Sequence, residues 1–236
     1  MLNLSYFYFA TWRLIIYIIN LNRHRRFAFK KGNFTRGAGR ELAKSKPFIV
    51  GIAGGSGSGK STFCEILVQE LKDYQVSVVS TDQFFKRPLP KMISPVSRVE
   101  YDDFNHPDAL DFSKFSEHLH ELLNAEQLAD VIIVEGIFTL YFEELRQLLD
   151  LKIFVDLDAD ERMYRRIRRN MQNWGVSMEE VATYYLEAAK HREAEFALPT
   201  KKFANIILNG NDLHGTSKDI ITYWIKNRIK ENSSLS

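Results

Sequence analysis

A glycine-rich segment is the first feature of this sequence that points to chemistry. It matches the pattern G-x-x-x-x-G-K-[ST], and it lies between an apolar run and an amphipathic helical stretch. Glycines let the backbone curl so that successive N–H groups face phosphate oxygens, and the following helix N-terminus adds partial positive charge. The predicted phosphate-binding residues are Gly54, Gly55, Ser56, Gly57, Ser58, Gly59, Lys60, Ser61 and Thr62.

Two side chains of this loop have specific expected roles. The Lys60 ammonium should reach the β- and γ-phosphates of a nucleotide, and the Ser61 hydroxyl should bind Mg²⁺. The predicted cofactors are therefore ATP and Mg²⁺. The alternative is a flexible Gly/Ser turn, and the strand–loop–helix context argues against it.

Two carboxylates follow apolar runs that are typical of buried strands. Asp82 comes after the run 76–79, and Glu135 comes after the run 131–134. In a doubly wound sheet the carboxyl ends of the strands open onto the ligand crevice. We therefore expect Asp82 to accept the proton of an attacking hydroxyl or to hold Mg²⁺, and Glu135 to hold the metal directly or through water. The structural alternatives are a helix N-cap at Asp82 and an ordinary strand-end acid at Glu135.

Four arginines recur at helical spacing later in the chain. Arg162, Arg165, Arg166 and Arg169 fall at i, i+3, i+4 and i+7, which predicts one basic stripe on a helix. A mobile helix with arginines can close over ATP as a lid and stabilise charge on the transferring phosphoryl group. The alternative is a solvated basic face that pairs with the acidic residues just before it.

Alternating strands and helices predict the fold. Largely apolar strands between helices favour an α/β architecture: a doubly wound, five-stranded parallel sheet of the P-loop NTPase type, covered on both faces and carrying a helical lid. The predicted strands are 48–53, 76–79, 131–134, 152–155 and 205–208, and the predicted helices are 61–72, 112–124, 143–149, 160–173, 177–197 and 217–231.

Residues 1–43 differ from the predicted P-loop domain at 44–236. Residues 1–40 contain eight basic and no acidic side chains, which leaves 24 basic and 30 acidic residues elsewhere, a net charge of −6. This acidic body gives no reason to expect nucleic-acid binding. The apolar run 4–21 and the basic run 23–31 fit a membrane anchor, an organelle transit segment or a non-functional extension. Membrane contact through this leader therefore stays open.

Size and cysteine content bound the remaining properties. The chain has 236 residues, 45% of them apolar, which is enough for one buried α/β domain. Its one cysteine, Cys64, permits no disulfide within the chain and fits a reducing compartment. We predict a cytoplasmic location, with an anchored or organellar one left open by the leader. Assembly into a homo-oligomer is also left open.

Together these motifs resemble the uridine kinase family, which is related to phosphoribulokinase and the riboside kinases. The resemblance implies that Asp82 is the general base, that Glu135 helps to hold magnesium, and that Arg166 and Arg169 serve the phosphates. It covers residues 46–213, with anchors at 51–62, 80–85, 106–109, 135–137, 154–160, the arginine helix and 198–204.

The chain departs from that family where the family reads a pyrimidine. Only about twenty residues join Leu110 to Val131, too few for the family's β-hairpin beside a helix. Val176 and Tyr184 stand where the family has a base-reading arginine and a glutamine. Loss of such polar partners is expected to change selectivity.

The acceptor side has further candidates. The family's ribose-binding aspartate is Asn105 here, with Asp103 nearby. His106 either lines the acceptor pocket or caps a turn before Pro107. The predicted substrate residues are Asp82, Asn105, His106 and Tyr184, and we do not assign His191 and Arg192 to phosphate binding.

These observations predict an ATP-dependent kinase that phosphorylates a hydroxyl of a small metabolite. The favoured acceptor is the 5′-hydroxyl of a nucleoside, and another sugar-like alcohol stays open. The alternative is a nucleotide-binding regulatory protein without kinase turnover, although a pure binder has no need of a base such as Asp82.

Overall fold

The computed structural model describes residues 46–234, so the predicted leader at 1–43 lies outside the described residues. The core is a parallel sheet in the order β2-β5-β1-β6-β7, which confirms the predicted five-stranded α/β fold. Its strands are β1 (Phe48–Ala53), β2 (Val76–Ser80), β5 (Val131–Glu135), β6 (Leu151–Asp156) and β7 (Ile206–Asn209).

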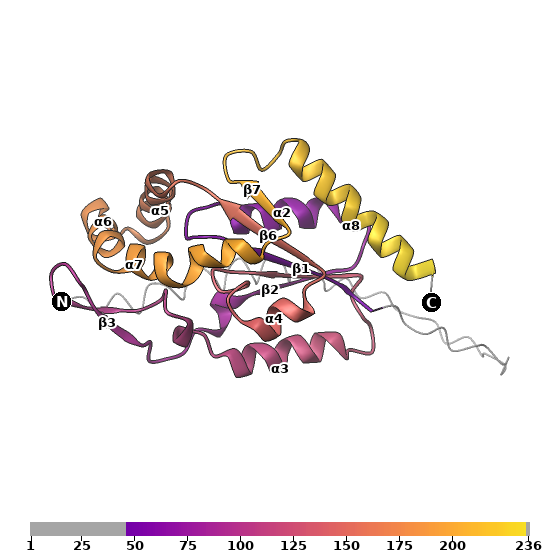
Figure 1. The fold of residues 1–236 in the computed structure, drawn as a ribbon, viewed down its shortest axis with the longest axis horizontal. Coiled ribbons are helices and arrows are strands. Elements are labelled where there is room, and N and C mark those ends of the chain that lie inside the picture. Colours follow the sequence, from indigo (N-terminus) through magenta and orange to yellow (C-terminus); the bar gives the residue numbers. More distant parts are fainter. Residues whose placement is uncertain (1–45, 235–236) are drawn as a thin grey trace.

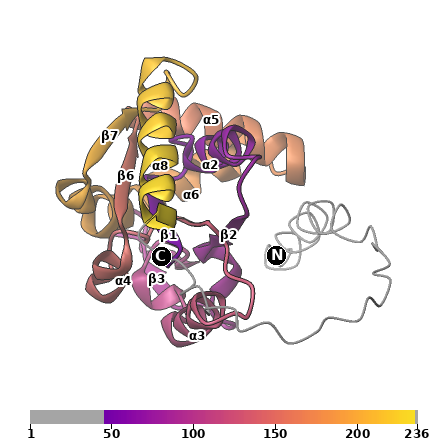
Figure 2. The ribbon, with the colours of Figure 1, turned by 90° about the vertical axis from the view of Figure 1, so that its right-hand side faces the viewer.

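Alternate side chains of each central strand face opposite layers of helices. In β1, Phe48, Val50 and Ile52 join one apolar cluster, whereas Ile49 and Ala53 join the other. This period of two is what a strand buried on both faces requires. Helices α2 (Lys60–Glu70) and α8 (Thr216–Ser234) cover the first face, and α3 (Phe112–Leu123) and α4 (Glu143–Leu148) cover the second (Figures 1 and 2). None of the helices within 46–234 combines the length and apolarity needed to cross a membrane.

Helices α5 (Ala159–Trp174), α6 (Met178–Tyr184) and α7 (Lys190–Arg192) gather at one end of the sheet, on the left of Figure 1. They correspond to the predicted lid. The predicted helix over 177–197 is helical throughout from Met178 to Ala197, but π-helical turns at Tyr185–Ala189 and Glu193–Ala197, which were not predicted, replace regular α turns. Each π turn inserts an extra residue and rotates the following side chains to a new face.

Two short strands near the lid were not predicted. Strands β3 (Lys91–Ile93) and β4 (Glu100–Asp102) pair antiparallel, and Lys91 and Asp102 form an ion pair at 2.7 Å. The prediction about the family's hairpin is confirmed: between Leu110 and Val131, a segment described throughout, α3 is the only helix and there is no strand.

Candidate active site

The phosphate loop runs from the end of β1 to the start of α2. Gly57 and Gly59 have φ values of 85° and 103°, a region that L side chains rarely adopt. A Cβ at Gly57 would also lie 2.5 Å from the backbone oxygen of Arg162. Among the described residues no side chain caps the N-terminus of α2. Its first N–H groups are therefore suited to binding phosphate oxygens.

Glu135 lies between the phosphate loop and the end of β2, because β5 is the strand between β1 and β2. Its side chain is buried, with Oε2 accepting a hydrogen bond from Ser61 Oγ at 3.0 Å and Oε1 accepting one from Ser80 Oγ at 2.6 Å. Hydroxyl and carboxylate oxygens are the ligands that Mg²⁺ prefers. Ser61 and Glu135 thus fit the predicted metal.

Within residues 46–234 no group of three or more His, Cys, Asp or Glu side chains converges on one point. In phosphotransferases Mg²⁺ is held by one or two protein ligands together with phosphate oxygens and water, and Ser61 and Glu135 provide such ligands here. The residues present therefore fit MgATP, although they would not form a metal cage by themselves.

Asp82 lies in the 3₁₀ turn Thr81–Phe84 that follows β2. Its Oδ1 atom is buried and has no hydrogen-bond partner among the described residues. Burial raises the pKa of Asp82 to about 6. The negative charge of Glu135 also raises this pKa, whereas the positive charges of Lys60 and Arg169 lower it. The N-cap alternative for Asp82 is not what the structure shows, since Ser80 holds the N-cap position. A desolvated carboxyl with this pKa suits a general base.

Arg166 and Arg169 lie on α5, and the charge of Arg169 acts on the Asp82 carboxyl. Arg166 is 7% exposed, and its Nε and Nη1 atoms are buried without a partner among the described residues. Its guanidinium lies 5.2 Å from the ring centroid of Tyr184. Buried donors of this kind are normally satisfied, so an anionic oxygen is the expected missing partner.

The four arginines of the predicted basic stripe do not share the same surroundings. Arg162 pairs with Glu193, and Arg165 donates to Gly210 O at 3.0 Å and to Asn211 Oδ1 at 2.6 Å. Side chains at i, i+3, i+4 and i+7 span about 100° of a helix circumference, so they meet different neighbours. Arg169 also has a protein partner, since its Nε donates to Asn170 Oδ1 at 3.2 Å, so three of the four arginines bond to protein groups.

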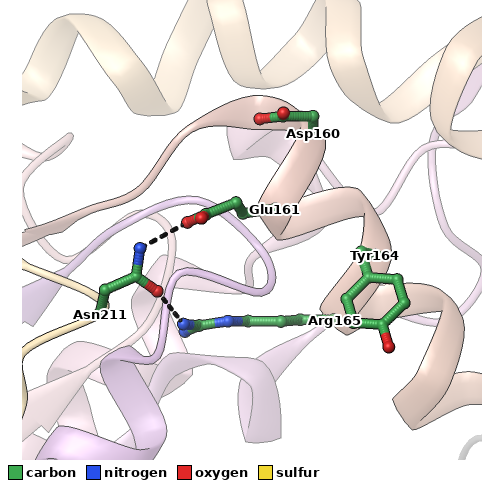
Figure 3. Close-up of a pocket in the computed structure, with 5 residues that line it drawn as sticks. All are labelled: Asp160, Glu161, Tyr164, Arg165 and Asn211. Atoms are coloured by element: carbon green, nitrogen blue, oxygen red, sulfur yellow. Dashed lines mark hydrogen bonds between the residues drawn. The ribbon is translucent and has the colours of Figure 1, made fainter.

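A pocket of about 290 Å³ lies beside the phosphate loop, and Figure 3 shows its side chains. Asn211 links two of them, since it donates to Glu161 and accepts from Arg165. Arg165, which lines the pocket, lies next to the phosphate loop. A Cβ atom added at Gly59 would be 3.6 Å from Arg165 Nη1. Sequence reasoning missed Asn211, whose only signal is the Asn-Gly-Asn turn after the last strand. The lining residues are Asp160, Glu161, Tyr164, Arg165 and Asn211.

Two predicted substrate residues meet on the acceptor side. Asn105 Nδ2 donates to the Tyr184 hydroxyl at 3.3 Å, and that hydroxyl donates to the backbone oxygen of Asp102 at 3.1 Å. Asp103, which lies near the family's ribose-binding position, is 1% exposed and accepts from Arg192 Nε at 2.7 Å. Asp103 is therefore already engaged by a side chain of the lid.

His106 caps a turn. Its Nδ1 atom accepts from the backbone N–H of Asp108 at 3.1 Å, at the N-cap of the 3₁₀ turn Pro107–Ala109. The imidazole ring also packs edge-on against Phe196 at 4.7 Å. The structural interpretation thus holds, and contact between His106 and an acceptor stays a prediction.

Comparison with known proteins places the chain in a family. The family described as "Phosphoribulokinase / Uridine kinase family" matches residues 49–129 and 114–213. The uridine kinase of Clostridium novyi is 34% identical over 208 residues, with 79% of this chain and 99% of that protein covered. Uridine-cytidine kinase B of Dictyostelium discoideum is 32% identical over 209 residues, with 80% and 85% covered.

Two further similarities differ in extent. The chloroplastic uridine/cytidine kinase UKL1 of Arabidopsis thaliana is 34% identical over 214 residues, which cover 80% of this chain but 43% of that protein. A solved structure of a proposed fructose transport system kinase from Silicibacter sp. TM1040 aligns with a TM-score of 0.51 at 17% identity, over 70% of this chain and 90% of that one. That likeness shows the fold alone. On the strength of the family match and the Clostridium relative, this chain belongs to the phosphoribulokinase / uridine kinase family and is an ATP-dependent kinase of the P-loop class.

Proposed function

We propose that this protein transfers the γ-phosphoryl group of MgATP to the 5′-hydroxyl of a nucleoside. The observation that carries the proposal is the Asp82 carboxyl, desolvated at the end of β2 and influenced by Lys60 and Glu135. With a pKa of about 6 it is ionised at neutral pH and still accepts a proton readily.

The nucleotide half of the site is the loop 54–61 with Thr62. In the proposal Lys60 binds the β- and γ-phosphates, and Ser61 and Glu135 hold the magnesium ion. MgATP, when bound, supplies the phosphoryl group and neutralises part of its charge. The pocket beside Arg165 and Asn211 adjoins the loop at Gly59, so we assign it to the base of the nucleotide.

The acceptor half combines polar groups with aromatic rings. Asp82 takes the proton of the attacking hydroxyl, and Asn105 and Tyr184 orient the sugar. Rings of Phe85 and Phe104 lie 6.1 Å apart near the same end of the sheet. Aromatic faces beside hydrogen-bonding groups suit a planar base attached to a polyol, which supports a nucleoside as acceptor.

Arg166 and Arg169 supply positive charge for the phosphoryl group that is transferred. Negative charge spreads over the γ-phosphoryl oxygens in the transition state, and guanidinium groups on a lid stabilise it there. The two buried nitrogens of Arg166 that have no partner among the described residues are suited to this role. Closure of the lid would also keep water away from the phosphoryl group, which limits wasteful hydrolysis of ATP.

The test is ADP release from MgATP by the full chain. The acceptor panel is uridine, cytidine, nicotinamide riboside, ribulose 5-phosphate, pantothenate and glycerate. Asp82→Asn is the inactive variant, and Asp73→Asn, at an exposed turn position, is the matched control. Stimulation by a nucleoside that Asp82→Asn abolishes and Asp73→Asn retains supports the proposal. Binding of ATP without stimulation by any acceptor would refute it in favour of a regulatory nucleotide-binding protein.

A further inference from the structure

Glu193 is a buried carboxylate that the proposed reaction does not use. It lies in the lid, 1% exposed, at the start of a π-helical turn. Its Oε1 atom accepts from the backbone N–H of Ser56 at 2.9 Å, and its Oε2 atom pairs with Arg162. The two oxygens therefore join the phosphate loop to α5, across 137 residues of sequence between Ser56 and Glu193.

Arg162 lies along the same side of the loop. Its Nε atom donates to the backbone oxygen of Leu157 at 3.0 Å, and the residue is 3% exposed. A Cβ at Gly55 would lie 2.4 Å from Arg162 Nη1, and one at Gly57 would lie 2.5 Å from its backbone oxygen. The loop thus contacts Arg162 of α5 at Gly55 and Gly57, and it contacts Glu193 at Ser56.

A buried ion pair is weak evidence for a purely stabilising role, because the desolvation of both charges offsets most of their attraction. The distribution of the contacts is more informative. One carboxylate oxygen of Glu193 accepts a hydrogen bond from a backbone N–H of the loop. Arg162, the ion-pair partner of Glu193, packs against the glycines on either side of that N–H. Both members of the pair therefore act on the shape of the loop.

We propose that Glu193 is a positioning residue that holds the phosphate loop in its nucleotide-binding conformation, through the Ser56 N–H and through Arg162. The inference rests on the proposed function, because it takes the loop 54–61 as the site of the ATP phosphates. In this proposal the contact between Glu193 of the lid and Ser56 of the loop forms before the nucleotide binds. Glu193 does not touch the reacting atoms in this proposal.

The test measures MgADP binding to the full chain by titration calorimetry, so it needs no acceptor. Glu193→Gln keeps the shape of the side chain and removes its charge. A hydrogen bond to a charged group contributes enough that its loss should weaken MgADP binding about tenfold. Glu195→Gln is the matched control, since Glu195 pairs with Arg192 on the same segment and is 54% exposed. This control should bind MgADP like the unchanged chain.

A second variant separates positioning from folding. Glu193→Gln leaves Arg162 buried without a charged partner, which can destabilise the whole domain. The double variant Arg162→Met with Glu193→Met replaces the pair by apolar side chains of comparable size, a change that proteins often tolerate. The thermal midpoint of the double variant should stay close to that of the unchanged chain. Its MgADP binding should weaken about tenfold. In steady-state kinetics its KM for ATP should rise by a larger factor than its kcat falls.

Amide hydrogen exchange provides a readout without nucleotide. In the nucleotide-free protein, the Ser56 N–H should exchange faster in both Glu193 variants than in Glu195→Gln. A folded double variant that binds MgADP as tightly as the unchanged chain, with unchanged exchange at Ser56, would overturn the inference and leave the proposed function intact. Failure of the unchanged chain to bind MgADP would overturn both.

Discussion

Replacement of Asp82 by asparagine should make the protein more stable while it removes kinase activity. The carboxyl is less favourably ionised in the folded protein than in the unfolded chain, because burial raises its pKa to about 6 from an ordinary value of 3.8. Asparagine keeps the shape and carries no charge. It therefore avoids the cost of ionising a buried acid and cannot accept the proton of the attacking hydroxyl.

The magnitude follows from that pKa. A rise from 3.8 to about 6 corresponds to about 3 kcal/mol against the ionised form in the folded state. Asp82 keeps some solvent exposure and interacts with Glu135, so we expect a gain of about 2 kcal/mol in the free energy of unfolding.

The pH dependence has a definite sign. Between pH 3.8 and about 6 the folded state holds a proton on Asp82 that the unfolded chain has lost, so the stability of the unchanged protein falls as the pH rises through this window. Above about pH 6 both states are ionised and the penalty is constant. The advantage of Asp82→Asn should therefore be small near pH 4 and complete near pH 8.

The assay is urea unfolding of both proteins at about pH 4.5 and about pH 8, with the m-value as a check on the unfolding mechanism. Asp73→Asn is again the exposed control and should show little change at either pH. A loss of stability in Asp82→Asn at pH 8, or a gain of the same size at both pH values, would refute the assignment of a raised pKa to Asp82. In the unchanged enzyme, kcat/KM should fall as the pH drops below about 6.

Two substitutions and one thiol reagent test other parts of the structure. Glu135→Gln removes a proposed magnesium ligand, so the Mg²⁺ concentration for half-maximal activity should rise about tenfold. It also removes a negative charge that raises the pKa of Asp82, so the acid limb of the pH profile should shift to lower pH. A magnesium titration at several pH values checks both effects. Tyr184→Phe removes the hydroxyl that binds Asn105, so the acceptor KM should rise about tenfold while the KM for ATP stays constant in steady-state kinetics. Equal changes in the two constants would contradict this. Burial raises the pKa of the Cys64 thiol, so Ellman's reagent should react with it in urea and hardly at all in the native protein, and fast native reaction would disprove the placement.

The sheet and the positions of Asp82 and Glu135 were predictable from the sequence because they depend on local patterns. The strand at 48–53 is an uninterrupted apolar run before the glycine loop, and it matches β1 at both ends. Asp82 and Glu135 follow from the rule that strand ends line the ligand crevice. Their proximity to the loop needed only the strand order.

The partners of charged side chains were not predictable in this way. Arg162 has the same chemistry and spacing as Arg166, yet Arg162 meets Glu193, and the sequence between them contains no signal for that contact. The π turns after Tyr184 also escaped prediction, because 177–197 has continuous helical character and the extra residue is accommodated by tertiary packing. The three-residue strands β3 and β4 are too short for a periodic pattern to emerge.

The adjacent lid residues Arg192 and Glu193 bear on the order of events in turnover. Arg192 binds Asp103 on the acceptor side, and Glu193 binds the Ser56 N–H on the nucleotide side. Because the two residues are neighbours in one segment, a movement that breaks one contact strains the other. Entry of the two substrates and exit of the two products would then share one opening step, so initial-rate plots should show ternary-complex kinetics.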